Sequence, residues 1–511
     1  MLAKNKAFYL VFFGLILLHL VLFNAQRLYP FADLPHHLAE ATIYRYAGQG
    51  DNQLAHYYPF DLAPYANAFH ILFMANPLFA SVEIGAKIFH SIYLLLLPLS
   101  IWLLIRELEG DIWFSLMAFL YLYNYDFCWG LSAFSFFLPL FFVFWAVLIK
   151  YKKSNKIRHN IALILLLGFI YHVHIMGFFF VGAVLLLAVL FFDRDSFKRP
   201  GMKVIFVLPF LGGAGIALMN AVAVKRVGSY LLRYYADMTV LNFPSRMREF
   251  LLFDNLILFG GRKGELVAAV FSFFVIGLII QRLYQAYQHR TFRQSLGFGK
   301  YLYPVLVCAL LCFFLLPHKI PGHGSPYQRF SSLFFLGLIV LGALLKPRSS
   351  KGLKITICVL VSIHFLLWGY FLTDFNRQNR GFTRDFFPVA QPGKVLTGMI
   401  FDKIYRRFPV YIHFPDFYIV WRKGIAATAM QKYGYVIFDN NLARRPLPAY
   451  DEWLSASSNL IPEDFAADLL LVRGIPSAKF RRFVDRHFRL LRAAGQWLLY
   501  ERKPFKLTPV P

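Results

Sequence analysis

Residues 8–24 read FYLVFFGLILLHLVLFN, an apolar run without Asp, Glu, Lys or Arg. A transmembrane helix needs about 20 mostly apolar residues, with about 17–25 as the usual range. The segment 160–192 is too long for one helix, and Tyr171-His172-Val173-His174 breaks it into two short ones. Comparable runs lie near residues 86–105, 112–126, 131–149, 203–224, 266–281, 301–317, 328–345 and 354–373. The sequence therefore predicts a polytopic α-helical membrane protein with about eleven transmembrane helices.

The composition of the chain agrees with this class of protein. Of its 511 residues, 58% are hydrophobic and 16% are charged, and the mean hydropathy is +0.52. A soluble domain carries about 25% charged residues. The net charge of +27 would suggest nucleic acid for a soluble protein. Here it suits Lys and Arg in cytoplasmic loops that face anionic lipid. We therefore expect a lipid bilayer as partner and no nucleic acid.

The loop charges predict the orientation, because cytoplasmic loops of membrane proteins are rich in Lys and Arg. A cytoplasmic N-terminus makes most of the cytoplasmic loops basic, whereas the opposite loop 124–130 carries no Lys or Arg. The cytoplasmic loops are then 106–111, 150–159, 193–203, 281–300 and 346–354. An odd number of spans places residues 374–511 outside the cytoplasm. No Asn-x-Ser/Thr sequon occurs in the chain, which favours a bacterial inner membrane.

We expect two domains, a membrane domain over residues 1–373 and an extracytoplasmic α/β domain over residues 374–511. The first external loop, about residues 25–85, contains an apolar stretch that prolines interrupt, which predicts helices lying in the interface. In the terminal domain the pattern predicts strands, a helix and a closing hairpin around Gly495. These elements are the strands 394–401, 433–439 and 468–474, the helix 477–488 and the hairpin 489–503.

The predicted spans hold essentially no ionisable residues in their interiors, which disfavours an ion-coupled transporter. The residues capable of chemistry lie instead at the level of the outer membrane surface, contributed by four external loops. They are Asp33, His36, His37, Asn124, Asp126, His172, His174, His318, Lys319, His323 and Arg329. This asymmetry between the two faces is the main functional indication in the sequence.

Several of these residues have two interpretations. Asp33 can act as a catalytic carboxylate or can cap the helix that follows it. His172 and His174 can be interfacial histidines, and Arg329 can extend to the lipid headgroups. The basic residues of the loop 225–265 can bind an anion or can be tolerated in a long external loop. The histidines have no recognised zinc-ligand spacing, so the sequence predicts no metal site.

Two short motifs resemble the GT-C glycosyltransferases, membrane enzymes that use polyprenyl-phosphate-linked sugars. The stretch FADLPHHL, residues 31–38, is similar to the acidic motif in their first external loop. Trp129-Gly130-Leu131-Ser132, leading into residues 136–140, is similar to the start of a span in many bacterial members. The predicted topology, with interfacial helices in a long first external loop and an external C-terminal domain, also resembles that family. The resemblance in topology covers roughly the first 375 residues.

The resemblance implies transfer of a sugar from a polyprenyl-phosphate donor to a glycan, lipid or protein acceptor, with inversion. Asp33 is then the expected base, because the acceptor hydroxyl must lose a proton. Arg329 is the expected ligand of the departing phosphate, because that group gains negative charge. Residues expected to assist Arg329 are His318, Lys319 and His323, and further site candidates are His36, His37, His172, His174 and Asp126.

The sequence also departs from the family. Many members carry a paired acidic motif, whereas Asp33 has no adjacent carboxylate. We therefore expect no certain cofactor, although a divalent metal stays open. A non-enzymatic flippase or assembly factor for lipid-linked glycans would need only the basic cluster. A membrane acyl- or phosphotransferase would need a histidine such as His172 or His37.

Overall fold

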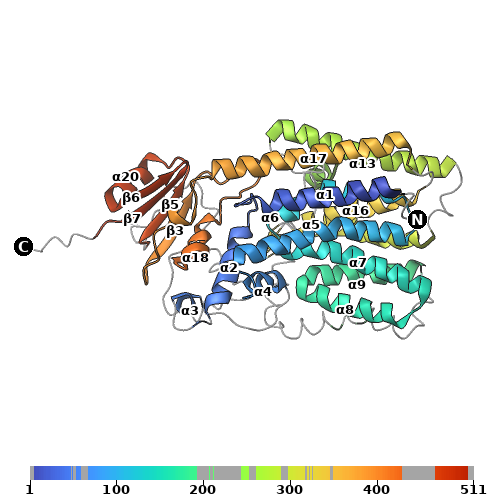
Figure 1. Ribbon diagram of the computed structural model, residues 1–511, viewed down its shortest axis with the longest axis horizontal. Helices are drawn as coiled ribbons and strands as arrows, with labels where there is room; N and C mark the ends of the chain where they lie inside the picture. Colours follow the sequence, from blue (N-terminus) through green and yellow to red (C-terminus); the bar gives the residue numbers. More distant parts are fainter. Residues whose placement is uncertain are drawn as a thin grey trace, which may run out of the picture.

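The computed structural model shows a bundle of long helices with a small sheet at one end (Figure 1). The structure describes residues 5–47, 49, 53–58, 67–192, 207, 211, 243–251, 261–288, 297–316, 319–320, 323–324, 326–345, 349–427 and 467–504. Nearly all of the predicted span 203–224, most of the loop 225–265 and the whole predicted strand 433–439 lie outside these residues. The start of helix α1 and the sheet lie at opposite ends of the bundle (Figure 1).

The long helices coincide with most of the predicted apolar runs. They are α1 (Lys6–Asn24), α5 (Val82–Glu107), α7 (Ser132–Ser154), α8 (Ile157–Val173), α9 (Ile175–Phe192), α13 (Gly261–Gln288), α15 (Leu302–Leu315), α16 (Arg329–Leu344) and α17 (Lys351–Gln378). Among the described residues, seven helices are long and apolar enough to cross a membrane. The helical membrane architecture is therefore confirmed, whereas the number of about eleven spans is not. Helices α8 and α9 meet at His174, where the sequence predicts the break.

The segment predicted as a span over 112–126 is different. It forms a 3₁₀ helix, η2 (Ile112–Tyr121), followed by the short helix α6 (Tyr125–Trp129). The Asp111 side chain accepts a hydrogen bond from the Trp113 N–H at the start of η2. The residues Phe114–Tyr123 are almost completely buried, and η2 packs against α5, α16 and α17. An apolar run of this length is equally compatible with a helix that faces lipid and with a helix that is buried in protein. Its composition therefore does not distinguish these two environments.

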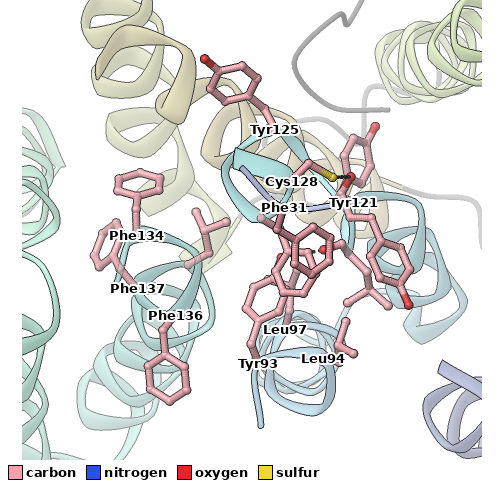
Figure 2. Packing of buried hydrophobic residues seen from close by; sticks show 14 of the residues in the cluster. Phe31, Tyr93, Leu94, Leu97, Tyr121, Tyr125, Cys128, Phe134, Phe136 and Phe137 are labelled. Carbon is pink, nitrogen blue, oxygen red and sulfur yellow. Dashed lines mark hydrogen bonds between the residues drawn. The ribbon is translucent and has the colours of Figure 1, made fainter. Parts of the chain in front are cut away.

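Phenylalanines on α7 join the helices of the bundle. Phe136 stacks on Phe89 of α5 at 4.7 Å between ring centroids. Phe134 lies 5.0 Å from the ring of His174 and 5.8 Å from the ring of Phe330. Figure 2 shows Phe134 and Phe137 on a different side of α7 from Phe136. Helix α7 is therefore covered by protein on several faces, which explains why most of its residues are buried.

The segment predicted as the first external loop forms three short helices beside the end of the bundle. They are α2 (Leu34–Ala47), α3 (Gln53–Tyr57) and α4 (Phe69–Ala75). A helix rises about 1.5 Å per residue, so none of these described helices is long enough to cross a bilayer. Helix α2 packs against α4 and α5, and on its other side it contacts the C-terminal region.

The C-terminal region contains a five-stranded sheet in the order β4-β3-β5-β7-β6. β3 is parallel to β4 and β5, whereas β7 is antiparallel to β5 and β6. Its elements are β3 (Val395–Ile400), η7 (Phe414–Asp416), α18 (Phe417–Arg422), β4 (Ile425–Ala426), β5 (Leu469–Arg473), α20 (Ala478–His487), β6 (Phe488–Ala494) and β7 (Trp497–Arg502). β3, β5, α20 and the β6–β7 hairpin lie where the sequence predicts them. Helix α18 and η7 were not predicted.

Three polar contacts hold the C-terminal region against the membrane bundle. The Tyr58 hydroxyl donates to the Ala426 carbonyl at 2.6 Å and accepts from the Ala426 N–H at 2.9 Å. The Trp421 indole N–H donates to Glu83 at the start of α5. The Arg27 guanidinium donates to the Phe382 carbonyl. In addition, α18 and η7 contact α2 directly.

Candidate active site

Asp33 lies in the turn between α1 and α2, and α6 fixes its backbone. The Asp33 N–H donates to the Trp129 carbonyl at 2.8 Å, and the Ala32 N–H donates to the Cys128 carbonyl. Gly130 ends α6 with φ +81, in the left-handed region that favours glycine. A Cβ atom at Gly130 would lie 3.0 Å from the Asp33 nitrogen. The two motifs quoted for the family resemblance are therefore adjacent in space.

The Asp33 carboxylate faces the C-terminal region. Its Oδ1 atom lies 3.5 Å from Nε2 of His413, and its side chain is 24% exposed. Burial raises the pKa of Asp33, but the interactions with His413, His37 and His36 outweigh burial and hold that pKa below its usual value. Among the described residues the carboxylate makes no hydrogen bond to the first N–H groups of α2. The described contact of the Asp33 side chain is thus with His413.

His36 follows Asp33 by three residues and lies on the first turn of α2. Its Nδ1 atom is 3.0 Å from Oδ2 of Asp416, and its Nε2 atom is 3.9 Å from Oε1 of Glu40. Burial lowers the pKa of His36, but the hydrogen bond with Asp416 and the charge of Glu40 outweigh it and raise that pKa to about 9. The ring of His413 lies 5.0 Å from the ring of His36. Two histidines and an aspartate from separate regions of the chain thus form one buried cluster.

His37 extends the cluster toward α4. Its Nδ1 atom lies 3.0 Å from Oε2 of Glu40 and 3.3 Å from Nε2 of His70. Glu40 and His70 are both buried. Glu40 thus serves two neighbouring histidines, His36 and His37, and connects them through a single carboxylate. His36, His37 and Asp33 therefore lie together, as the sequence expects of residues in one external motif.

Arg329, Asp126 and His174 form a second cluster on the other side of α6. Arg329 is 4% exposed, and its Nη1 atom lies 3.4 Å from Nε2 of His174. The Ser332 hydroxyl donates to Oδ2 of the buried Asp126, which belongs to α6. Arg329 is enclosed by the bundle, and its described contacts are with protein side chains. Because α6 carries Asp126 and also binds the Asp33 backbone, one short helix separates the two clusters.

A small pocket opens beside α6, between α17 and the C-terminal region. It is lined by Pro30, Cys128, Trp368, Phe371, Tyr405, Arg406, Arg407, Phe408 and Val410. The Arg406 guanidinium lies 4.2 Å from the ring centroid of Phe371 and 3.4 Å from Asp374. The Tyr405 hydroxyl donates to the same Asp374 carboxylate. The pocket thus combines aromatic walls with two arginines. One of its lining residues, Pro30, lies three residues before Asp33 in the chain.

The other predicted residues do not join these clusters in the described part of the chain. His172 is exposed at the end of α8. His318 lies outside the described residues. Lys319 and His323 lie on the short antiparallel strands β1 (Lys319–Ile320) and β2 (His323–Gly324), of which the structure describes only the backbone. Arg246, on α12 (Phe243–Leu251), donates to the Phe314 carbonyl and stacks on Tyr327, which indicates a packing role.

Sequence reasoning missed the half of the cluster that comes from the C-terminal region. His413 and Asp416 lie in the segment YIHFPDF, residues 411–417, where they are the polar residues of an aromatic stretch. That pattern alone could have marked them as buried polar residues that need partners. Nothing local in the sequence shows that the partners are Asp33 and His36. His36 and Asp416, for example, are separated by 380 residues in the chain.

His36, His413 and Asp416 are residue types that can hold a metal ion. One potential ligand atom from each lies within 4.8 Å of the others, and all three residues are buried. Two imidazoles and a carboxylate are ligands typical of zinc. The spacing of histidines along the sequence predicted no metal, because one ligand comes from α2 and two come from the segment before α18.

No protein-family model matches the chain, and no curated protein is significantly similar to it. Among solved structures, the chain is similar to ArnT from Cupriavidus metallidurans, crystallised bound to undecaprenyl phosphate. The two sequences are 10% identical, and the alignment covers 98% of this chain and 99% of the ArnT chain with a TM-score of 0.42. A likeness this distant carries no argument about activity, which has to come from the residues of the chain itself.

Proposed function

We propose that the protein is a membrane glycosyltransferase that uses a polyprenyl-phosphate sugar on the extracytoplasmic side. The observation that carries this proposal is the Asp33 carboxylate. It is partly exposed at the end of the helical bundle, and His413 from the C-terminal region contacts it at 3.5 Å. A carboxylate held at the level where a lipid-linked sugar meets water suits a reaction between a membrane-bound donor and a water-exposed acceptor.

Asp33 acts as the general base in this proposal. It takes the proton of an acceptor hydroxyl as the hydroxyl oxygen attacks the anomeric carbon. The bond between that carbon and the phosphate oxygen breaks, and the polyprenyl phosphate leaves with the bonding electrons. A single displacement of this kind inverts the anomeric centre. Its low pKa keeps Asp33 ionised at neutral pH, as a base must be.

Arg329 is the proposed contact for the donor phosphate. Its planar guanidinium can donate two hydrogen bonds to a phosphate at once. Its position supports this role, because α6 contacts both groups of residues. The backbone of α6 binds the Asp33 N–H, and Asp126 of α6 belongs to the cluster that contains Arg329. His174 and Asp126 border Arg329 in this arrangement. His318, Lys319 and His323, which precede Arg329 in the chain, remain the residues proposed to assist it.

The pocket beside α6 is the proposed place for the start of the lipid chain. Trp368, Phe371 and Phe408 give it aromatic walls, and Arg406 and Arg407 add positive charge at its edge. Apolar walls with a few placed polar groups are typical of sites for small organic ligands. A polyprenyl phosphate combines these two properties, an apolar chain and an anionic head.

The experiment is a transfer assay with purified protein in lipid nanodiscs and a panel of undecaprenyl-phosphate sugars. We expect the parent protein to release undecaprenyl phosphate from one of these donors, and Asp33→Asn to release at least about 100-fold less, as general-base loss commonly costs. His172→Gln is the matched control, because His172 is exposed and outside both clusters. A protein that moves the intact donor across the bilayer without releasing undecaprenyl phosphate would be a flippase instead.

A further inference from the structure

We propose that His36, His413 and Asp416 bind one divalent transition-metal ion, with Zn²⁺ as the best-suited ion, and that this ion links α2 to the C-terminal region. The three residues converge from two parts of the chain that are joined by no covalent cross-link. His36 lies on the first turn of α2, His413 directly precedes η7, and Asp416 is the last residue of η7. All three are buried.

The distances within the cluster suit a shared ion. One potential ligand atom from each residue lies within 4.8 Å of the others. The Nδ1 atom of His36 and Oδ2 of Asp416 are 3.0 Å apart. Ligand atoms on one tetrahedral zinc ion are separated by roughly 3.3 Å, given bonds of about 2.0–2.1 Å. Small side-chain rotations would therefore bring the three atoms to bonding distance.

The surroundings of the two histidines add a second, independent observation. Nε2 of His36 lies 3.9 Å from Glu40, and Nε2 of His413 lies 3.5 Å from Asp33. Metal-binding histidines commonly use their other ring nitrogen to contact a carboxylate, which orients the ring. Nδ1 of His36 is then the ring nitrogen that faces the Asp416 carboxylate, and Nδ1 of His413 is the ring nitrogen that Asp33 does not contact. Nδ1 of His413 is buried and has no hydrogen-bond partner in the described part of the protein.

Three protein ligands leave a position open on a tetrahedral ion, as in catalytic rather than structural zinc sites. The partly exposed Asp33 side chain marks the side from which an ion could enter. An ion bound here would fix the ring of His413, and through it the carboxylate of Asp33. His413 is therefore a positioning residue for Asp33 as well as a proposed ligand.

The experiment measures metal content in full-length protein purified with a tag that contains no histidine. The protein is stripped with a chelator, dialysed, and titrated with Zn²⁺, and with Co²⁺ as an optical probe. We expect one Zn²⁺ per chain and a visible Co²⁺ spectrum of tetrahedral type. We expect His36→Gln, His413→Gln and Asp416→Asn each to lose the stoichiometric ion, whereas His172→Gln, the exposed external control, retains it.

Glu40→Gln removes only the partner of a ligand, so we expect it to bind Zn²⁺ about 10–100-fold more weakly without losing the site. Each variant is checked for folding by gel filtration and circular dichroism. If a ligand variant does not fold, the weaker Zn²⁺ binding expected of the milder Glu40→Gln variant still tests the proposal. No stoichiometric uptake by the parent, or equal losses in His413→Gln and His172→Gln, would overturn the proposal. Because the measurement needs no sugar donor, its result is independent of whether glycosyl transfer is found.

Discussion

At the scale of single residues, Asp33 and His413 are the pair on which the proposed chemistry depends. Asp33 could be singled out in the sequence because it is the first acidic residue after the N-terminal apolar run. His413 could not, because a single histidine in an aromatic stretch resembles any buried histidine. Contacts between residues this far apart in the chain depend on the packing of whole elements, which local sequence patterns do not report.

The Asp33→Asn substitution tests the role of the carboxylate directly. Asparagine has nearly the same shape but cannot accept the proton, so we expect transfer to be lost. We expect the melting temperature to stay close to that of the parent, since the carboxylate caps no described helix N–H group. Turnover and thermal unfolding of the same preparations check both expectations. An active Asp33→Asn enzyme would assign the base to another residue.

Substitution of Arg329 separates a phosphate ligand from a packing residue. Arg329→Lys keeps the charge and loses the planar fork, so we expect weaker donor binding, and we expect Arg329→Ala to weaken it severely. Binding of undecaprenyl phosphate to purified variants is the measurement.

Arg282→Ala is the matched control for the loss of a buried guanidinium. Arg282 is also buried, and it donates to the Leu345 carbonyl near the other end of α16. We expect that variant to lose about 1–3 kcal/mol of stability, from unsatisfied partners, with unchanged binding. Equal affinity in Arg329→Ala and the parent would assign the phosphate to a different residue.

At the scale of elements, the short helix α6 connects the two polar clusters. The sequence predicts one continuous span where the structure has η2 and α6, because both arrangements bury an equally apolar run. Helices α8 and α9 were predicted correctly, since the polar His172 and His174 interrupt their apolar pattern. The length of apolar runs thus identified the long helices, including the largely buried α7, and it failed over residues 112–126, where the same apolar run forms two short helices.

Gly130→Ala tests whether α6 positions Asp33. The substitution forces a side chain into the left-handed region, at a cost of about 1–2 kcal/mol. It also places a methyl group 2.8 Å from the Leu34 nitrogen. We expect reduced turnover together with a lower melting temperature. The control is Gly168→Ala in α8, where no atom lies within 4 Å of the new methyl group. Full activity in Gly130→Ala would show that the turn tolerates displacement.

Tyr58→Phe tests the contact between the first external loop and β4. Removal of the hydroxyl leaves the Ala426 N–H and carbonyl without this partner, and we expect a loss of about 1–3 kcal/mol. Thermal unfolding in detergent measures it. Tyr284→Phe is the control, because the Tyr284 hydroxyl bonds only the exposed Gln288 side chain among its described contacts. Equal melting temperatures in the two variants would mean that this contact contributes little to docking.

At the scale of the whole molecule, the candidate site is assembled from both ends of the chain. The first external loop supplies Asp33 and His36, and the C-terminal region supplies His413 and Asp416. The helical membrane class followed from composition and run length, and the strands β3 and β5 followed from short, strand-like apolar segments. The docking of the C-terminal region onto the segment around α2 and α3 could not be predicted, because it depends on side-chain contacts such as Tyr58 with Ala426.

The orientation across the membrane remains a prediction of the loop charges. Helix α1 begins at the end of the bundle opposite the sheet (Figure 1), as expected if the two lie on opposite sides. A periplasmic reporter enzyme fused after Pro511 should be active, and a cytoplasmic reporter fused at the same position should be inactive. The reverse pattern would place the sheet and Asp33 in the cytoplasm.

The most direct test of the central claim is the release of undecaprenyl phosphate from its sugar-linked form, followed by mass spectrometry in nanodiscs that contain the parent protein or Asp33→Asn. The account predicts release by the parent, with the sugar appearing on the acceptor in the inverted configuration, and at least about 100-fold less release by Asp33→Asn. Equal release by the two proteins, or transfer with retention of configuration, would contradict it.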